Sequence, residues 1–124
     1  MIVTNVTRTA VLSNRCRFAN SFWKRLVGLL DHKAMAEGEG LLLDHCQGIH
    51  TFGMRFPIDV LYLDKDFHVL QTVTNLRPFR ASLLRTTAFV LELPAGTIHR
   101  TRTVVGDEIH IRITNVMPLH KQHD

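Results

Sequence analysis

Long hydrophobic runs are missing from this chain of 124 residues. No apolar stretch approaches the roughly 18 residues that a membrane-spanning helix needs. Residues 1–10 alternate polar and apolar side chains and lack the charged and then apolar blocks of a signal peptide. These two absences predict a cytoplasmic protein without a transmembrane segment.

Internal repeats and low-complexity tracts are also absent. The composition, 45% hydrophobic and 21% charged, is that of a globular protein and not of a disordered one. A chain of this length buries about two-thirds of its surface on folding, which is enough for a core without metals or disulfides. The sequence therefore predicts a single domain over residues 1–124.

Cysteine is scarce, and the two cysteines, Cys16 and Cys46, lie too far apart for a C-x-x-C or zinc-binding spacing. In a reducing compartment both are expected to be small apolar core residues. The eight histidines include no H-x-x-x-H or H-E-x-x-H pair on a plausible helix. We therefore predict no metal site and no cofactor.

Acidic residues are fewer than basic ones, 11 against 15, which gives a net charge of +4. An excess this small is weak evidence for a nucleic-acid partner, and no run of basic residues strengthens it. Arg77, Arg80 and Arg85 surround Phe79 in an expected loop, where arginines most often make local contacts in solvent. Nucleic acid is thus an unlikely partner, although weak binding through this Arg-rich loop stays an alternative.

The periodicity that is present is mainly that of β-strands. Residues 76–86 are expected to form a loop, and 94–97 a sharp turn into a short helical turn after residue 96. Strands recur about every ten residues, which favours an α+β, mainly β fold: a curled antiparallel sheet forming a partly closed barrel. The predicted strands are 2–6, 10–12, 41–43, 50–52, 58–63, 67–74, 88–93 and 108–113.

One segment has clear helical spacing. Asn20 and Ser21 are good N-cap residues, and the apolar side chains that follow them fall on one face of a helix. The sequence therefore predicts one main helix at about 21–30, which covers one face or one opening of the barrel.

Asp59 interrupts an apolar strand face, because it alternates onto the same side as Leu61 and Leu63. A carboxylate in such surroundings must be hydrogen-bonded or paired, or its pKa rises. One interpretation is structural, with Asp59 accepting backbone N–H groups of the 52–56 loop. The other is a general base or a ligand-binding carboxylate.

Glu92 is a second acid on an apolar strand face, next to the turn that contains Gly96 and Thr97. Free N–H groups at the start of the helical turn are able to hold an anion. Alternatively, Glu92 caps these amides itself or pairs with Arg100. Two carboxylates, Asp59 and Glu92, also suit general acid–base chemistry if their separation is right.

A third candidate lies in residues 44–50. Cys46 and His50 have the chemistry of a nucleophile and its base, and with Met54 that of a soft metal site. Cys46, His50 and Met54 span eight residues, over about 25 Å along a straight strand, so one ion reaches all three only if the chain bends. Both interpretations need further residues from elsewhere in the chain.

These segments resemble a known family, the bacterial and archaeal domain of unknown function 192, described as an uncharacterised ancient conserved region. The resemblance covers about residues 16–113 and implies a compact α+β, mainly β fold, with no established activity. Its signatures are Phe52-x-Met54-x-x-Pro57-Ile58-Asp59-Val60-x-Tyr62-Leu63-Asp64, Val90-Leu91-Glu92-Leu93-Pro94-Ala95-Gly96-Thr97 and Val105-Gly106-Asp107, with Arg25-Leu26-Val27-Gly28-Leu29-Leu30 and Gly38-Glu39-Gly40-Leu41 earlier in the chain.

We expect a non-catalytic module, a small-ligand-binding or accessory protein, and not an enzyme. Its partner would be a small molecule or a protein, held in a polar cleft between the 52–59 loop and the 92–97 turn. The alternatives are a hydrolase or transferase that uses Asp59 and Glu92, or Cys46 and His50. The candidate ligand-binding residues are Phe52, Met54, Asp59, Glu92, Gly96 and Thr97.

Overall fold

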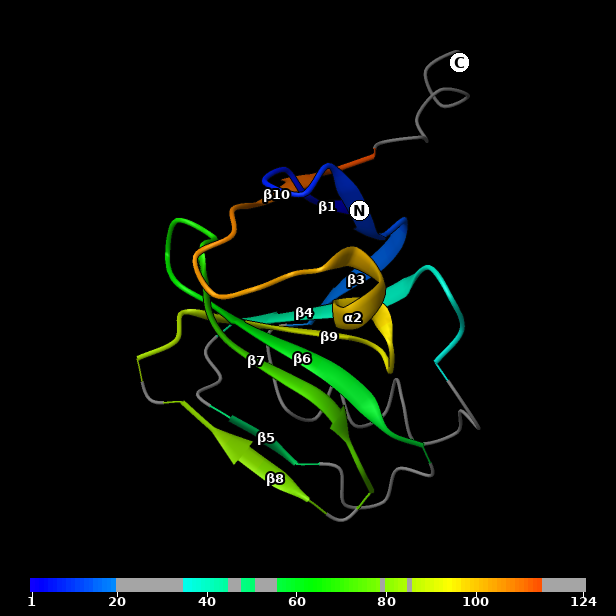
Figure 1. Ribbon diagram of the computed structural model, residues 1–124, viewed down its shortest axis with the longest axis vertical. Coiled ribbons are helices and arrows are strands. Elements are labelled where there is room, and N and C mark those ends of the chain that lie inside the picture. The colour runs from blue at the N-terminus through cyan, green and yellow to red at the C-terminus, as the bar shows by residue number, and fades with distance from the viewer. Residues whose placement is uncertain (20–34, 45–47, 51–55, 79, 85, 115–124) are drawn as a thin grey trace, which may run out of the picture.

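The computed structural model describes residues 1–19, 35–44, 48–50, 56–78, 80–84 and 86–114, in which ten strands form three sheets beside one short helix (Figure 1). The mainly β, α+β class expected from the sequence is confirmed. The predicted helix at 21–30 lies outside the described residues. The predicted helical turn after residue 96 is present as α2 (Thr97–Thr101).

The central sheet has five strands. In spatial order they are β3 (Arg15–Ala19), β4 (Glu39–Asp44), β9 (Phe89–Pro94), β6 (Ile58–Leu63) and β7 (Val69–Leu76). All six residues of β6 are buried, because β6 lies inside the sheet and both of its faces are covered. The neighbouring pairs are antiparallel except β3 and β4, which run parallel.

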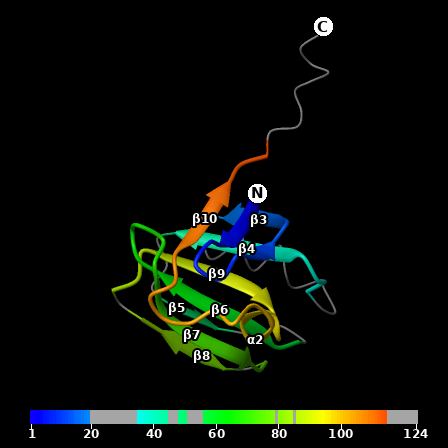
Figure 2. The same ribbon diagram turned by 45° about the horizontal axis from the view of Figure 1, so that its top comes forward.

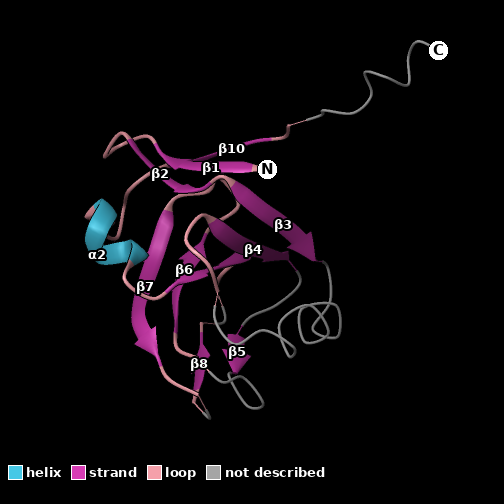
Figure 3. Ribbon diagram, turned by 90° about the vertical axis from the view of Figure 1, so that its right-hand side faces the viewer, coloured by secondary structure: helices cyan, strands magenta, loops and turns pink. Residues whose placement is uncertain are grey.

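Two smaller sheets cover the two faces of the central one (Figures 2 and 3). The first is antiparallel and consists of β1 (Ile2–Asn5), β2 (Ala10–Ser13) and β10 (Ile109–Arg112). The second pairs β5 (Gly48–His50) with β8 (Ala81–Leu83). A hydrogen bond of 2.7 Å between Tyr62 Oη on β6 and Ser82 Oγ on β8 joins this second sheet to the central one.

Alternation along the central strands produces two apolar clusters, one on each face. Towards the three-stranded sheet, Leu61 and Leu91 pack with Val3, Leu12 and Ile109. Towards β8 the other face carries a second cluster, which includes Leu41, Leu43, Ile58, Val60, Tyr62 and Val90. Because side chains of one strand alternate between faces, neighbouring residues of β6 and β9 belong to different clusters.

The partly closed barrel predicted from the sequence is wrong. Within the described residues, β3 and β7 form opposite edges of the central sheet, and the other strands belong to separate sheets. The expectation of a wholly antiparallel sheet is also corrected by the parallel pair β3–β4. A parallel pair needs a long crossover connection, and residues 20–38 connect β3 to β4.

A buried hydrogen-bond network around Asp107 joins β1 to the segment after α2. Asp107 is 3% exposed. Its Oδ2 atom accepts hydrogen bonds from three donors, each at 3.0 Å: Asn5 Nδ2, Arg8 Nε and Val104 N. Burial alone raises the pKa of this carboxyl, but these donors and the Arg8 charge outweigh burial and hold the pKa below its ordinary value of 3.8.

Asp107→Asn is expected to lower the free energy of unfolding at pH 7 by about 2 kcal/mol, because an amide NH₂ would face hydrogen-bond donors and the charge beside Arg8 would be lost. Since the folded pKa is lowered, the carboxylate contributes stability above the unfolded pKa, and this contribution disappears as the pH falls through the folded value. Urea unfolding between pH 7 and pH 2 should show the two proteins converging in acid. Glu108→Gln, which alters an exposed neighbouring carboxylate, is the control, and its free energy of unfolding should stay close to that of the natural chain.

Candidate functional site

Asp59 lies on β6 on the same face as Leu61 and Leu63, as predicted, and is 0% exposed. Its Oδ2 atom accepts hydrogen bonds from Gly96 N at 3.1 Å and Ile98 N at 2.8 Å. Its Oδ1 atom accepts one from Asn75 N at 2.9 Å. Both carboxylate oxygens are therefore occupied by backbone amides.

These amides belong to β7 and to the start of α2, whereas the sequence analysis assigned the donors to the 52–56 loop. Residues 52–55 lie outside the described part of the chain. α2 has no side-chain cap of its own, and its N-cap residue Gly96 adopts a left-handed conformation with φ 97°. Asp59 supplies the missing cap from a neighbouring strand, with its negative charge at the positive end of the helix. The amides proposed to hold an external anion are thus used by an internal carboxylate.

Glu92 lies on the opposite face of the central sheet. In the strand register it pairs with Leu41 on β4 and Val60 on β6, whereas Asp59 pairs with Leu93. Directly paired residues share a face, so Glu92 faces the cluster that contains Leu41 and Val60. Glu92 is also 0% exposed. The structure therefore does not bring Asp59 and Glu92 together, and acid–base chemistry that needs both on one substrate is not supported.

Several other candidates fall outside what the structure describes. Phe52, Met54 and Cys46 are not among the described residues, and His50 is described only as part of β5. Cys16 is described and lies 4% exposed in the core. Burial is the main cause that raises the pKa of its thiol to about 11. Cys16 is therefore a core residue, as the sequence predicts.

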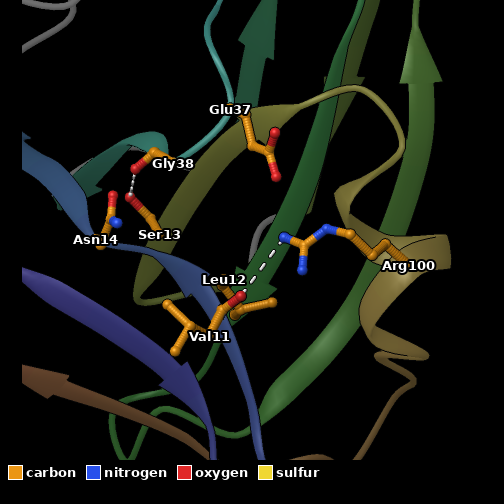
Figure 4. Close-up of a pocket in the computed structure, with 7 residues that line it drawn as sticks. All are labelled: Val11, Leu12, Ser13, Asn14, Glu37, Gly38 and Arg100. Atoms are coloured by element: carbon orange, nitrogen blue, oxygen red, sulfur yellow. Dashed lines mark hydrogen bonds between the residues drawn. The ribbon is translucent and has the colours of Figure 1, made fainter.

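Gly96 and Thr97, by contrast, line an open groove on the surface. One hollow of about 340 Å³ is bordered by residues 11–14, residues 37–38 and Arg100 (Figure 4). A second hollow of about 400 Å³ is bordered by Met35, Glu37, residues 94–97 and Arg100. Because both hollows share Glu37 and Arg100, they adjoin, and we call them together the Arg100 groove.

Hydrogen bonds to one backbone carbonyl fix the wall formed by residues 13–15 and 37–38. The carbonyl oxygen of Gly38 accepts hydrogen bonds from Ser13 Oγ at 2.7 Å, Asn14 N at 3.0 Å and Arg15 N at 2.9 Å. Gly38 has φ +88°, a conformation that favours glycine, and a Cβ atom there would lie 2.6 Å from Asn14 Oδ1. A Cβ atom on Gly40 would lie 2.8 Å from Ser13 Oγ. The Gly38-Glu39-Gly40 sequence thus allows this close approach of two chain segments.

The opposite wall is held by the Asp59 hydrogen bonds to Gly96 and Ile98. Thr97 Oγ1 also donates to the carbonyl of Pro94 at 2.7 Å, which closes the turn. Asp59 is therefore a positioning residue for the groove, although it does not line it. Sequence reasoning found Gly96 and Thr97 by their turn chemistry, but gave no signal for Ser13 or Glu37.

Arg100 extends across the groove from α2, and its Nη2 atom lies 3.5 Å from the carbonyl oxygen of Val11 (Figure 4). Glu37 projects its carboxylate into the same space from the 35–38 segment. Both side chains belong to exposed residues. The sequence analysis considered Arg100 as a partner of Glu92; the structure places it at the groove instead.

A family model of domain of unknown function 192 (DUF192), described as an uncharacterized ACR, matches residues 3–111. The chain belongs to this family. The chain is 30% identical to a UPF0127 protein of Pyrococcus horikoshii over 87% of its own length and 96% of that protein. It is 30% identical to a UPF0127 protein of Pyrococcus furiosus over 85% of its own length and 93% of that protein. The DUF192 resemblance predicted from the sequence is thereby confirmed.

Two crystal structures are similar to this DUF192 chain. One is a proposed transcription regulator from Sinorhizobium meliloti, with a TM-score of 0.74, 26% identity and coverage of 88% of this chain and 89% of that one. The other is a protein of unknown function from Novosphingobium aromaticivorans, with a TM-score of 0.72, 21% identity and coverage of 89% and 82%. At this identity the second structure supports the fold alone.

Membrane-spanning helices and clusters of metal-binding side chains are both absent from the described residues. Among them, no helix is long and apolar enough to cross a bilayer. In the same part of the chain, no three side chains of histidine, cysteine, aspartate or glutamate gather as metal ligands do.

Asp59→Asn is expected to destabilise the protein by about 3 kcal/mol, because an amide in place of the carboxylate would turn its NH₂ group toward buried N–H donors. If Asp59 served only as a general base or a ligand-binding carboxylate, this change would leave the melting temperature nearly unchanged. Thermal and urea unfolding distinguish the two. Asp66→Asn removes an exposed acid and is the control; equal stability of the two variants would contradict the capping role.

Cys16 is expected to resist thiol reagents in the native state at pH 7, because its thiolate is scarce and its sulfur is buried. A Cys46→Ser variant isolates its reaction with a disulfide reagent. Labelling should become fast only after unfolding in urea. Rapid labelling of Cys16 in the folded variant would show that the β2–β3 region opens readily.

Proposed function

We propose that this chain is a non-catalytic binding module that takes a small polar ligand in the Arg100 groove. The observation that carries the proposal is a groove with an arginine at its centre, between two walls that hydrogen bonds hold in place. Its hollows of about 340 and 400 Å³ are of the size that small-molecule sites have, which is about 300–1,000 Å³.

Both walls favour binding because they are fixed before a ligand arrives. Asp59 holds the 96–98 turn on one side, and the Gly38 carbonyl holds residues 13–15 on the other. A preformed site loses less conformational entropy on binding than a flexible one. The charged side chains at the centre then provide orientation and specificity.

The groove has few groups for catalysis. Ser13 and Thr97 supply hydroxyls, but each already donates to a backbone carbonyl, from Ser13 to Gly38 and from Thr97 to Pro94. A nucleophile needs an adjacent base. Among the described residues that border the groove, Glu37 is the one side chain that could act as a base, and both hydroxyls are bonded to backbone carbonyls instead of to it. These features support a binding role over a hydrolase or transferase.

The proposed cleft differs from the one that the sequence suggested. Gly96 and Thr97 line the Arg100 groove, as the sequence suggested. Asp59 does not line it but holds Gly96 in position by a hydrogen bond, and Glu92 lies on the other face of the sheet. Nucleic-acid binding through the Arg-rich loop gains no support, because Arg77 and Arg80 have interaction partners within the chain.

Filling the groove is expected to abolish ligand binding without unfolding the protein. Ala95 is exposed and borders the second hollow, so Ala95→Trp places a bulky side chain there. A library of amino acids, dicarboxylates, sugars and nucleotides would be screened by amide chemical shifts of ¹⁵N-labelled protein. Hits should shift residues 11–14, 37–38 and 95–97.

Lys65→Trp adds the same bulk in the turn at the far end of β6 and is the control. Binding should persist in Lys65→Trp and disappear in Ala95→Trp. The proposal fails if no compound in the library shifts the groove amides, or if Ala95→Trp binds every hit as well as the natural chain.

A further inference from the structure

The Arg100 groove brings two opposite charges to one space. Arg100 enters from α2, and Glu37 enters from the 35–38 segment, and both border each of the two hollows (Figure 4). No other charged residue lies among the described residues that border the groove. A ligand in the groove therefore meets one positive and one negative group.

Within the described part of the chain, neither charged group forms an ion pair. To the described residues, the Arg100 guanidinium makes a single long contact of 3.5 Å, to the Val11 carbonyl, although a guanidinium carries five N–H donors. Among the residues that the structure describes, no ion pair joins Arg100 to Glu37. By comparison, Arg8 forms an ion pair with the buried Asp107, in which Nε lies 3.0 Å from Oδ2. Arg15 Nη2 donates a hydrogen bond of 2.7 Å to the backbone carbonyl of Glu37.

We propose that the ligand of this groove is a small zwitterion, in which a carboxylate binds Arg100 and a protonated amine binds Glu37. This inference rests on the proposed function, because it names the ligand class of that site. A planar guanidinium matches a carboxylate with two parallel N–H donors, and a carboxylate accepts readily from an ammonium group.

Other ligand charges fit less well. A dianion would be attracted to Arg100 but repelled by the like charge of Glu37 in the same hollow. The amides at the start of α2 do not compensate, because Asp59 already uses Gly96 N and Ile98 N. A ligand with only a positive charge would be repelled by Arg100. A ligand with both charges is attracted at each end, by Arg100 at its carboxylate and by Glu37 at its amine.

The test compares probes that share a carbon chain and differ in charge. 4-Aminobutanoate and 6-aminohexanoate carry both groups, whereas butanoate, hexanoate and hexylamine carry one, and succinate carries two carboxylates. Affinities come from titrating the amide shifts of Gly38 and Ala95. At least one of the amino acids should bind about tenfold more tightly than its single-charge analogues and than succinate.

Variants identify the two contacts. Glu37→Gln should lower the affinity for the amino acid about fivefold and leave that for hexanoate unchanged, since only the amine contact is lost. Arg100→Gln should lower the affinity for the amino acid and for hexanoate alike. Arg102→Gln removes the same charge from an exposed residue that borders a different hollow, with Thr74 and His99, and should change neither affinity.

Two results would overturn the zwitterion while leaving the proposed function in place. One is succinate or hexanoate binding as tightly as the amino acids, which indicates a site for anions alone. The other is an amino acid whose affinity is the same in Glu37→Gln as in the natural chain. A groove that binds no compound in the wider library rejects both proposals.

Discussion

The described structure depends on one buried carboxylate that satisfies three backbone amides. Asp59 lies inside the central sheet, where an unpaired charge would be costly, and it accepts hydrogen bonds from β7 and from both sides of the first residue of α2. This arrangement resolves two problems at once. Backbone amides donate hydrogen bonds to both oxygens of the buried carboxylate. The helix α2, which lacks a side-chain cap of its own, gains a negative charge at its N-terminus.

A buried acid on an apolar strand is therefore not sufficient to locate a binding cleft. Asp59 and Glu92 look alike in sequence, yet their register places them on opposite faces of one sheet. Asp107, the third buried acid in the family signatures, is likewise bonded to Asn5, Arg8 and Val104. For Asp59 and Asp107 the contacts are structural, whereas the two charged side chains that border the groove, Glu37 and Arg100, are exposed, and patterns of burial do not mark them.

Sequence periodicity predicted the strands that alternate clearly, including β6 and β10, and turn chemistry predicted the helical turn of α2. It missed β3 and β8. β3 is an edge strand with exposed arginines and so lacks strict alternation, and β8 is three residues long within a segment rich in arginine. The parallel pairing of β3 with β4 is a long-range choice that local pattern does not encode. The groove was only half predicted for the same reason: residues 94–97 have turn chemistry, whereas Ser13, Glu37 and Arg100 meet only in the folded chain.

The hydrogen bonds of Asp59 also bear on the order of folding. They span 16, 37 and 39 residues of sequence, so each closes a loop that local structure cannot close. Contacts of such high contact order form slowly, because the entropy of loop closure is lost before the contact contributes. Asn75 lies on β7 and Gly96 follows β9, so the pairing of β6 with both strands brings these amides to its carboxylate. We therefore expect the groove to be among the last parts of the molecule to form, and a nascent chain to complete it only after Arg100 has been synthesised.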